Sequence, residues 1–178
     1  MAQITNLSCR CGGVQLRAVG APFIVTECHC NSCRVAAVRL SALPGARPFT
    51  AANGGTPSAL YRKDRVDIVA GAPHLKAFRL GPTAKTRRVV ATCCNTPVFL
   101  DFSGGHWMDL YAPLWPNGDM PKPQIRTMTR DLDDPSVLDD AIPSGALTTA
   151  KFYWTLLVVW AAMGFRAPEI DVAGEMEA

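Results

Sequence analysis

The sequence predicts a mainly β protein, in which an antiparallel body is followed by an added C-terminal apolar helix. Short segments with strand-like patterns recur across residues 1–102, and breaks rich in glycine, proline and asparagine separate them. A largely apolar stretch of helical length follows near the end of the chain. With 178 residues, of which 48% are hydrophobic and 19% charged, the chain has a globular composition and enough length for one core. We therefore expect a body over residues 1–143 and a helix with its tail over residues 144–178.

Within the body, each expected element has its own pattern. Residues 14–19 (Val-Gln-Leu-Arg-Ala-Val) alternate apolar and polar side chains, as a half-buried strand does. Residues 23–28 form a second strand that ends at a group of cysteines, residues 34–43 a short helix, and residues 51–57 a glycine-rich surface loop. The remaining strands are expected at residues 61–69, 74–80, 86–92 and 98–102, with turn-forming residues between them.

After the last of these strands the pattern changes. Residues 113–143 carry six prolines, which favours loops and short turns around the body. Residues 147–165 are mostly apolar, and Gly164 and Pro168 provide a helix stop. The most apolar part, residues 152–165, is shorter than the roughly 20 residues that a membrane span requires. We therefore expect a helix that packs on the body or joins two copies in a homodimer, rather than one that enters a membrane.

Three cysteines within six residues are the most informative feature of the chain. In Cys28-His29-Cys30-Asn31-Ser32-Cys33, an extended backbone would place Cys28 and Cys30 on one face and His29 on the other. The turn-forming Asn31 and Ser32 would then bring Cys33 back toward the first two sulfurs. Three convergent thiolates suit a soft tetrahedral ion such as zinc and leave its fourth position open. The alternative, three small buried apolar side chains, fits poorly with the polar residues between them.

Two histidines have more than one interpretation. His29 could orient a ligand or carry protons beside the cysteines, or it could be a packing residue, because it faces away from its neighbours. His106, in Ser103-Gly104-Gly105-His106-Trp107, is a candidate fourth ligand or general acid. The alternative for His106 is an exposed loop histidine.

A second set of cysteines comes from two distant parts of the sequence. Cys9 and Cys11 repeat the Cys-x-Cys spacing before two glycines, and Cys93 and Cys94 follow an expected strand. We expect Cys9, Cys11 and Cys94 as ligands of a second ion, with Cys93 as the weakest member, because consecutive strand residues face opposite sides. The alternative is that Cys93 and Cys94 belong to the core.

Cysteine use and charge also bear on where the protein works. The N-terminus has no charged segment followed by an apolar run, so we expect no secretory leader and a cytoplasmic protein. Seven cysteines, an odd number, then favour metal ligands or free thiols over a disulfide framework. A net charge of +3 is too small to indicate nucleic-acid binding by itself, and we expect none.

The order of these cysteines resembles that of a known family. Cys9-x-Cys11-Gly12, then Cys28-His29-Cys30-x-x-Cys33-Arg34, then Cys94-Asn95-Thr96-Pro97 is similar to the glutathione-dependent formaldehyde-activating enzyme and centromere protein V family. Weaker similarities lie at residues 62–71 and 132–135, so the resemblance spans roughly residues 7–136. The family's late element is Cys-x-x-Cys-Gly, and this chain departs from it. Here Ala91 stands in place of the first cysteine and Asn95 in place of the glycine.

The resemblance implies a β-tent fold with two zinc sites. Its structural site would use Cys9, Cys11 and the late cysteines, and its catalytic site Cys28, Cys30 and Cys33. It also implies a carbon–sulfur lyase-like reaction on a glutathione adduct or another thiol adduct. Arg34 and His29 are then candidates for ligand binding, and further cations that could hold the carboxylates of glutathione, or could be ordinary solvated charges, are Lys63, Arg65, Lys85, Arg87 and Arg88. The alternative function is a zinc-stabilised binding module without catalysis.

Overall fold

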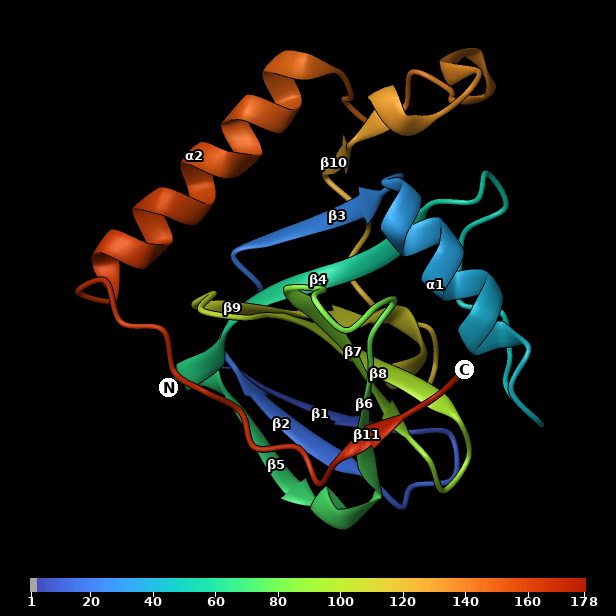
Figure 1. Cartoon of the computed structure of the whole chain (residues 1–178). Helices are drawn as coiled ribbons and strands as arrows, with labels where there is room; N and C mark the ends of the chain where they lie inside the picture. The colour runs from blue at the N-terminus through green and yellow to red at the C-terminus, as the bar shows by residue number, and fades with distance from the viewer. Residues whose placement is uncertain (1–2) are drawn as a thin grey trace.

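The computed structural model describes residues 3–178, which form two β-sheets and two helices (Figure 1). A three-stranded sheet has the order β1-β2-β5, and an eight-stranded sheet has the order β10-β3-β4-β9-β8-β7-β6-β11. The mainly β class and the added C-terminal helix are therefore confirmed. The strands are β1 Ile4–Ser8, β2 Gln15–Val19, β3 Ile24–Cys28, β4 Thr56–Arg62, β5 Val66–Ala70, β6 Leu75–Phe78, β7 Thr86–Ala91, β8 Thr96–Phe102, β9 Trp107–Tyr111, β10 Ile125–Thr127 and β11 Glu175–Met176, and the α-helices are α1 Asn31–Ser41 and α2 Ala146–Ala162.

The main core lies between the two sheets. Leu7 and Leu16 of the small sheet pack in one buried cluster with Val89, Phe99 and Leu110 of the large sheet. The next residues along two of those large-sheet strands, Leu100 on β8 and Tyr111 on β9, face the opposite side because strand side chains alternate. On that opposite side they pack with Ala36, Ala37 and Leu40, which are the buried residues of α1.

Several expected boundaries are wrong. The strand expected over residues 61–69 is two strands, because a 3-10 turn at Lys63–Arg65 separates β4 from β5 and sends them into different sheets. β4 begins at Thr56, inside the expected loop 51–57, and β9 extends the body beyond residue 102. The short helix expected at residues 34–43 begins earlier, at Asn31.

The pairing is antiparallel except at the two edges of the large sheet. β10 pairs in parallel with β3, and β11 pairs in parallel with β6. β10 lies within the proline-rich segment, which otherwise consists of loops and 3-10 turns as expected. β11 belongs to the tail after α2, so residues 144–178 leave the body as a helix and return to it as an edge strand (Figure 1).

α2 stands at one side of the large sheet and contacts it sparingly (Figure 1). Leu156 is its one buried residue, and the ring of Trp160 stacks on His106 with 6.0 Å between centroids. Leu147 and Trp154 are 80% and 67% exposed. Among the described residues, no helix combines the length and the apolar character that a membrane crossing requires.

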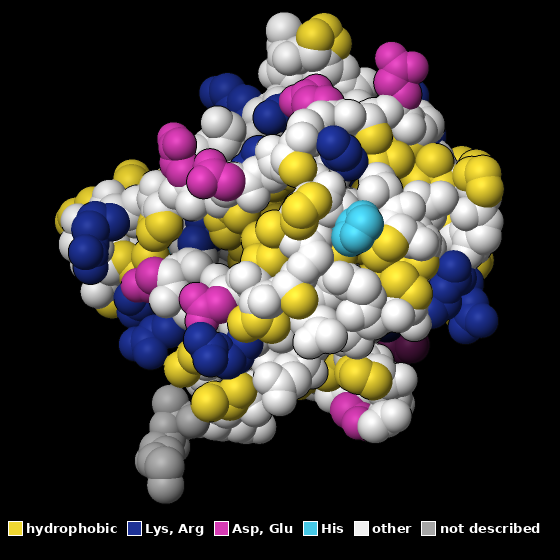
Figure 2. All heavy atoms as spheres, turned by 90° about the horizontal axis from the view of Figure 1, so that it is seen from below, with side chains coloured by type: hydrophobic (Ala, Val, Ile, Leu, Met, Phe, Trp, Pro, Cys, Tyr) yellow, Lys and Arg dark blue, Asp and Glu magenta, His cyan; other side chains and the backbone are white. Residues whose placement is uncertain are grey.

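Figure 2 views the molecule from below the small sheet. Lysine, arginine, aspartate and glutamate side chains are scattered around this face, with apolar surface between them. Both signs of charge occur side by side, so this face has no continuous basic surface of the kind that binds a phosphate backbone.

Candidate metal centres

The thiol triad, Cys28, Cys30 and Cys33, forms where β3 passes into α1. Cys28 is the last residue of β3, Cys30 caps the N-terminus of α1, and Cys33 lies in its first turn. The Cys30 sulfur accepts a hydrogen bond from the backbone N–H of Cys33 at 3.3 Å, which holds the two residues together. The three sulfurs lie within 4.8 Å of one another, so they could hold one metal ion. The expected convergence of these cysteines is thus present, and the expected turn at Asn31 and Ser32 is the first turn of the helix.

The closeness of the three sulfurs affects their ionisation. Hydrogen bonding with Cys28 lowers the pKa of Cys30. Hydrogen bonding with Cys28 and Cys30 raises the pKa of Cys33. Three thiols in this arrangement do not all ionise by themselves, because each thiolate opposes the next. A divalent cation among them would compensate the charge, and this donor set fits a thiophilic metal ion.

A buried arginine lies beneath the triad. Arg88 on β7 is 1% exposed, and its guanidinium donates to Ser32 Oγ at 3.3 Å and to Thr86 Oγ1 at 3.2 Å. Ser32 Oγ in turn lies 3.2 Å from the Cys30 sulfur. None of the ion pairs formed by the described residues includes Arg88. A buried cation needs a compensating charge, and the thiols of the triad and the carboxyl of Asp109 are the nearby groups able to supply one.

The triad opens into a cleft of about 640 Å³ between the large sheet and α2, which we call the triad cleft. One wall consists of side chains from α2, and the floor consists of residues from β3, β8 and β9 together with the loop before β9. The cleft residues are Thr26, Cys28, Cys30, Ser32, Cys33, Thr86, Leu100, Phe102, Gly104, Gly105, His106, Trp107, Asp109, Thr127, Met128, Phe152, Tyr153, Leu156, Leu157 and Trp160.

Asp109 is the one carboxylate of the triad cleft, and it was not among the residues expected at the site. It lies on β9 between Leu60 of β4 and Leu100 of β8. Burial raises the pKa of its carboxyl to about 7, and Oδ1 has no hydrogen-bond partner among the described residues. A lone acidic residue in an otherwise apolar strand pattern was the signal available in the sequence, because such a residue either faces solvent or serves a site.

His29 faces away from the triad, in agreement with the packing interpretation. Its ring is fully buried and bonds through Nε2 to Glu27 Oε1 at 3.0 Å. Arg126 donates to the same carboxylate oxygen at 2.8 Å, and Asn53 donates at 2.9 Å. Hydrogen bonding with His29, helped by Arg126, lowers the pKa of Glu27 to about 2. This network joins β3 to β10 behind the triad and is not part of the triad cleft.

The other expected ligand-binding groups lie outside the triad cleft. Arg34 donates to the backbone carbonyl of Asp131 at 3.2 Å. Lys63 and Arg87 both pair with Asp101, each at 2.7 Å, on the opposite face of the sheet.

His106 does lie in the cleft, but it is buried against Trp160 instead of being exposed, and burial lowers the pKa of its ring.

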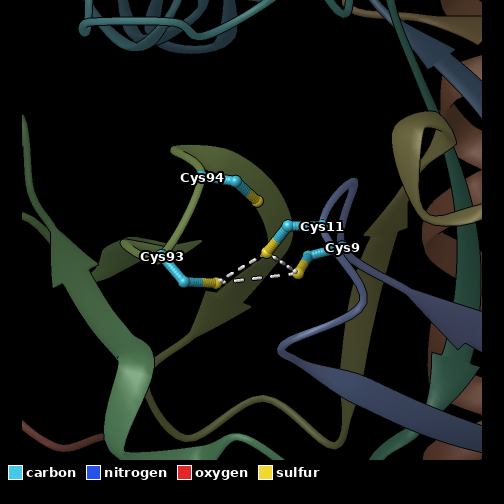
Figure 3. A group of neighbouring side chains, drawn as sticks. All are labelled: Cys9, Cys11, Cys93 and Cys94. Atoms are coloured by element: carbon cyan, nitrogen blue, oxygen red, sulfur yellow. Dashed lines mark hydrogen bonds between the residues drawn. The ribbon is translucent and has the colours of Figure 1, made fainter.

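The second group, the four-thiol cluster, consists of Cys9, Cys11, Cys93 and Cys94 (Figure 3). The sulfurs of Cys9, Cys11 and Cys93 lie 3.4–3.7 Å apart, and all four lie within 4.8 Å of one another. Four sulfurs bound to one tetrahedral zinc ion, each at about 2.3 Å, are separated by about 3.8 Å. The cluster could therefore hold a metal ion that joins the turn after β1 to the turn between β7 and β8.

Cys93 is a full member of this cluster, whereas the sequence indicated that it was the weakest. The reason is that Cys93 and Cys94 lie in a turn and not in a strand, so the alternation of strand side chains does not apply. The turn continues through Asn95 with φ of 50°, a left-handed conformation that glycine or asparagine adopts most readily. Cys93 is exposed, which also excludes the core interpretation for that residue.

A mainly β body that carries two groups of cysteines, each able to hold a metal ion, defines the class as a candidate metalloprotein. The chain belongs to the family described as "Family of unknown function (DUF6151)", whose match covers residues 1–108. That segment contains all seven cysteines but not α2.

Comparisons with individual proteins give little information beyond the family match. No curated protein matches the chain. Three chains of solved structures match it, and one of them is the crystal structure of a Rhodobacter sphaeroides protein determined by structural genomics. That protein is 17% identical, and the match covers 79% of this chain and 100% of the other with a TM-score of 0.47.

Proposed function

We propose that the protein is a zinc-binding enzyme of the carbon–sulfur lyase type, acting on a small thiol adduct at the triad. The observation that carries the proposal is that a three-sulfur group opens directly into a cleft of about 640 Å³. Three protein ligands and one open position are typical of a reactive zinc site, whereas four ligands are typical of a structural one. The resemblance to the formaldehyde-activating family and its β-tent fold supports the same assignment, and thiolate sites of this kind suit the cytoplasm.

In this proposal the two sites have different roles. Cys9, Cys11, Cys93 and Cys94 hold an ion that joins two distant turns of the body. Zinc at the triad would supply a Lewis-acid position for the sulfur or the hydroxyl of the ligand. Arg88 balances the negative charge of the three thiolates from below, and the apolar wall of α2 excludes water from the ligand.

The reaction would break the carbon–sulfur bond of a thiohemiacetal and release a free thiol and an aldehyde. The hydroxyl proton must leave while the sulfur departs with the bonding electrons and then takes up a proton, so no oxidant or reductant is needed. Asp109 is the titratable carboxyl of the cleft that could accept and return this proton, since its pKa lies near neutral pH.

A Cys30→Ser substitution tests the proposal cleanly. Serine is a preferred N-cap residue, so the hydroxyl keeps the bond from the Cys33 N–H while one thiolate is lost. Native mass spectrometry should show two zinc ions in the parent protein and one in the variant, with an unchanged circular dichroism spectrum. Turnover of the adduct of formaldehyde and a thiol should be lost as well. Two zinc ions in the variant would refute a zinc site at the triad. One zinc ion in the parent protein and one in the variant would refute it as well.

A zinc-stabilised binding module is the second candidate. The outer side of α2 favours it, because Leu147 and Trp154 are exposed seven residues apart and cover nothing in the described chain. Under this alternative Cys30→Ser would change the metal content without any catalytic consequence. A loss of turnover that accompanies the loss of one zinc ion would therefore decide for the enzyme.

A further inference from the structure

We infer that the triad cleft selects a neutral thiol, or its aldehyde adduct, whose body is aliphatic or aromatic, and that it disfavours an anionic thiol such as glutathione. This inference rests on the proposed function, because it takes the triad as the place where the ligand's sulfur is held. It concerns the rest of the ligand, which must lie along the cleft.

The walls of the cleft are apolar over most of their length. α2 contributes Phe152, Tyr153, Leu156, Leu157 and Trp160, which repeat at intervals of three and four residues and so share one face of the helix. The sheet side contributes Leu100, Phe102 and Trp107. A volume of about 640 Å³ accommodates a small organic molecule, and walls of this kind bind it mainly by removing its apolar surface from water.

The cleft offers no cation to a carboxylate. None of its residues is lysine or arginine. Residues along β7 alternate between the two faces of the sheet, so Arg87 faces a separate pocket that Lys63 and Lys85 also line. Arg88 faces the cleft side, but it is buried below the triad and engaged with Ser32 and Thr86.

The charge within the cleft is instead negative or neutral. Three thiolates around a divalent ion leave one negative charge, which the positive charge of Arg88 offsets from below, and Asp109 adds a negative charge when it ionises. The two carboxylates of glutathione would therefore enter a low-dielectric site without a partner, which is unfavourable. The remaining polar groups include the hydroxyls of Ser32, Tyr153 and three threonines, and the ring of His106, whose pKa is lowered by burial. Such groups suit an uncharged hydrogen-bonding group.

Two neighbouring residues of α2 allow a matched test. Leu157 lines the cleft and is 45% exposed, whereas Val158 does not line it and is 50% exposed. Leu157→Arg and Val158→Arg therefore add the same charge to the same helix at similar exposure, and only the first adds it to the cleft. Neither residue is buried, so both variants should fold.

The experiment follows the sulfur-to-cobalt absorption of the cobalt-substituted protein during titration with phenylmethanethiol, glutathione and benzyl alcohol. A closed four-thiol site should not respond to added thiol, so the difference spectrum reports on the triad. We expect phenylmethanethiol to bind at least tenfold more tightly than glutathione, and benzyl alcohol to leave the sulfur absorption unchanged. Leu157→Arg should narrow or reverse the preference between the two thiols, and Val158→Arg should keep it.

The outcomes separate this inference from the proposed function. Glutathione binding as tightly as phenylmethanethiol, or the same preference in both arginine variants, overturns the inference while the triad remains a thiol-binding metal site. A cobalt spectrum that is identical in the parent protein and in Cys30→Ser overturns the proposed metal site itself, and the inference falls with it. A thiol response confined to the parent triad, with the expected preference, supports both.

Discussion

The guanidinium of Arg88 donates a hydrogen bond to Ser32 Oγ across 3.3 Å, and this oxygen lies 3.2 Å from the sulfur of Cys30. Arg88 of β7 thus contacts Cys30, the N-cap residue of α1, through the hydroxyl of Ser32. Since Arg88 is almost fully buried, its charge acts in a low-dielectric environment and favours ionised thiols nearby.

Replacing this cation should weaken the metal at the triad selectively. We expect Arg88→Met to lower the zinc affinity of the triad by about 10–100-fold, which is the usual effect of removing a partner behind the ligands. Competition with a chromophoric chelator measures it. Arg87→Met, on the neighbouring residue that faces the other side of the sheet, is the control and should leave the affinity unchanged. Equal affinities in Arg88→Met and the parent protein would show that Arg88 has no electrostatic role there.

The four-thiol cluster should act as a cross-link. The sulfurs of Cys9 and Cys93 are 3.7 Å apart although 84 positions separate them in sequence. Closing a loop of this length stabilises a folded chain by up to roughly 4 kcal/mol. Cys11→Ser changes an exposed ligand without creating a cavity, so it should lower Tm in the metal-loaded protein.

Calorimetry with and without a zinc chelator checks this expectation. The chelator should lower Tm substantially in the parent protein and much less in Cys11→Ser. A parent Tm that does not respond to the chelator would mean that the cluster contributes nothing to stability.

Asp109 should make stability depend on pH. Burial raises the pKa of its carboxyl from 3.8 to about 7. Hydrogen bonding with Trp107 and the charge of Arg88 oppose this rise without cancelling it, and the charges of Cys30 and Asp101 add to it. The folded state therefore retains a proton that the unfolded chain has lost between these values. The stability that the protonated form contributes is complete below about pH 3.8 and is lost as the pH rises through about 7.

Asp109→Asn replaces the carboxyl with an uncharged amide, so the variant should not lose stability as the pH rises through about 7. We expect the variant to be more stable than the parent protein at pH 8, by on the order of 2–4 kcal/mol, with the difference shrinking as the pH falls toward 5. Urea unfolding of both proteins at matched pH values measures the difference. Two stability curves that run parallel from pH 5 to pH 8 would show that Asp109 titrates normally.

The sequence predicts best what depends on neighbouring residues. The triad comes from six consecutive residues, and strands such as β2 and β7 have clear patterns, so both could be predicted. β4 begins within Thr56-Pro57-Ser58, whose composition is typical of a loop, and it is a strand because β3 and β9 pair with it on either side. β10 and β11 are too short to have a pattern and exist because a neighbouring edge is available.

The triad cleft could not be predicted for a similar reason. Its walls combine α2, β8, β9 and the end of β3, and no local pattern indicates that these segments meet. The apolar character of α2 was evident, but the side that faces the triad and the side that faces solvent differ little in composition. The membership of Cys93 in the four-thiol cluster likewise depended on a turn that the sequence pattern did not separate from the preceding strand.

The homodimer expected through residues 147–165 stays a prediction. Leu147 and Trp154 are spaced by seven residues and are exposed on the outer side of α2. Two copies packing these side chains together would remove them from water. Sedimentation at micromolar concentration should show a dimer that Trp154→Glu converts to a monomer. A parent protein that sediments as a strict monomer would exclude this interface.

Anomalous diffraction at the zinc edge tests the central claim most directly. From crystals grown with zinc, we predict one peak between the sulfurs of Cys28, Cys30 and Cys33 and a second among Cys9, Cys11, Cys93 and Cys94. A density map without a peak at the triad, or with two of its sulfurs joined in a disulfide, would contradict the account.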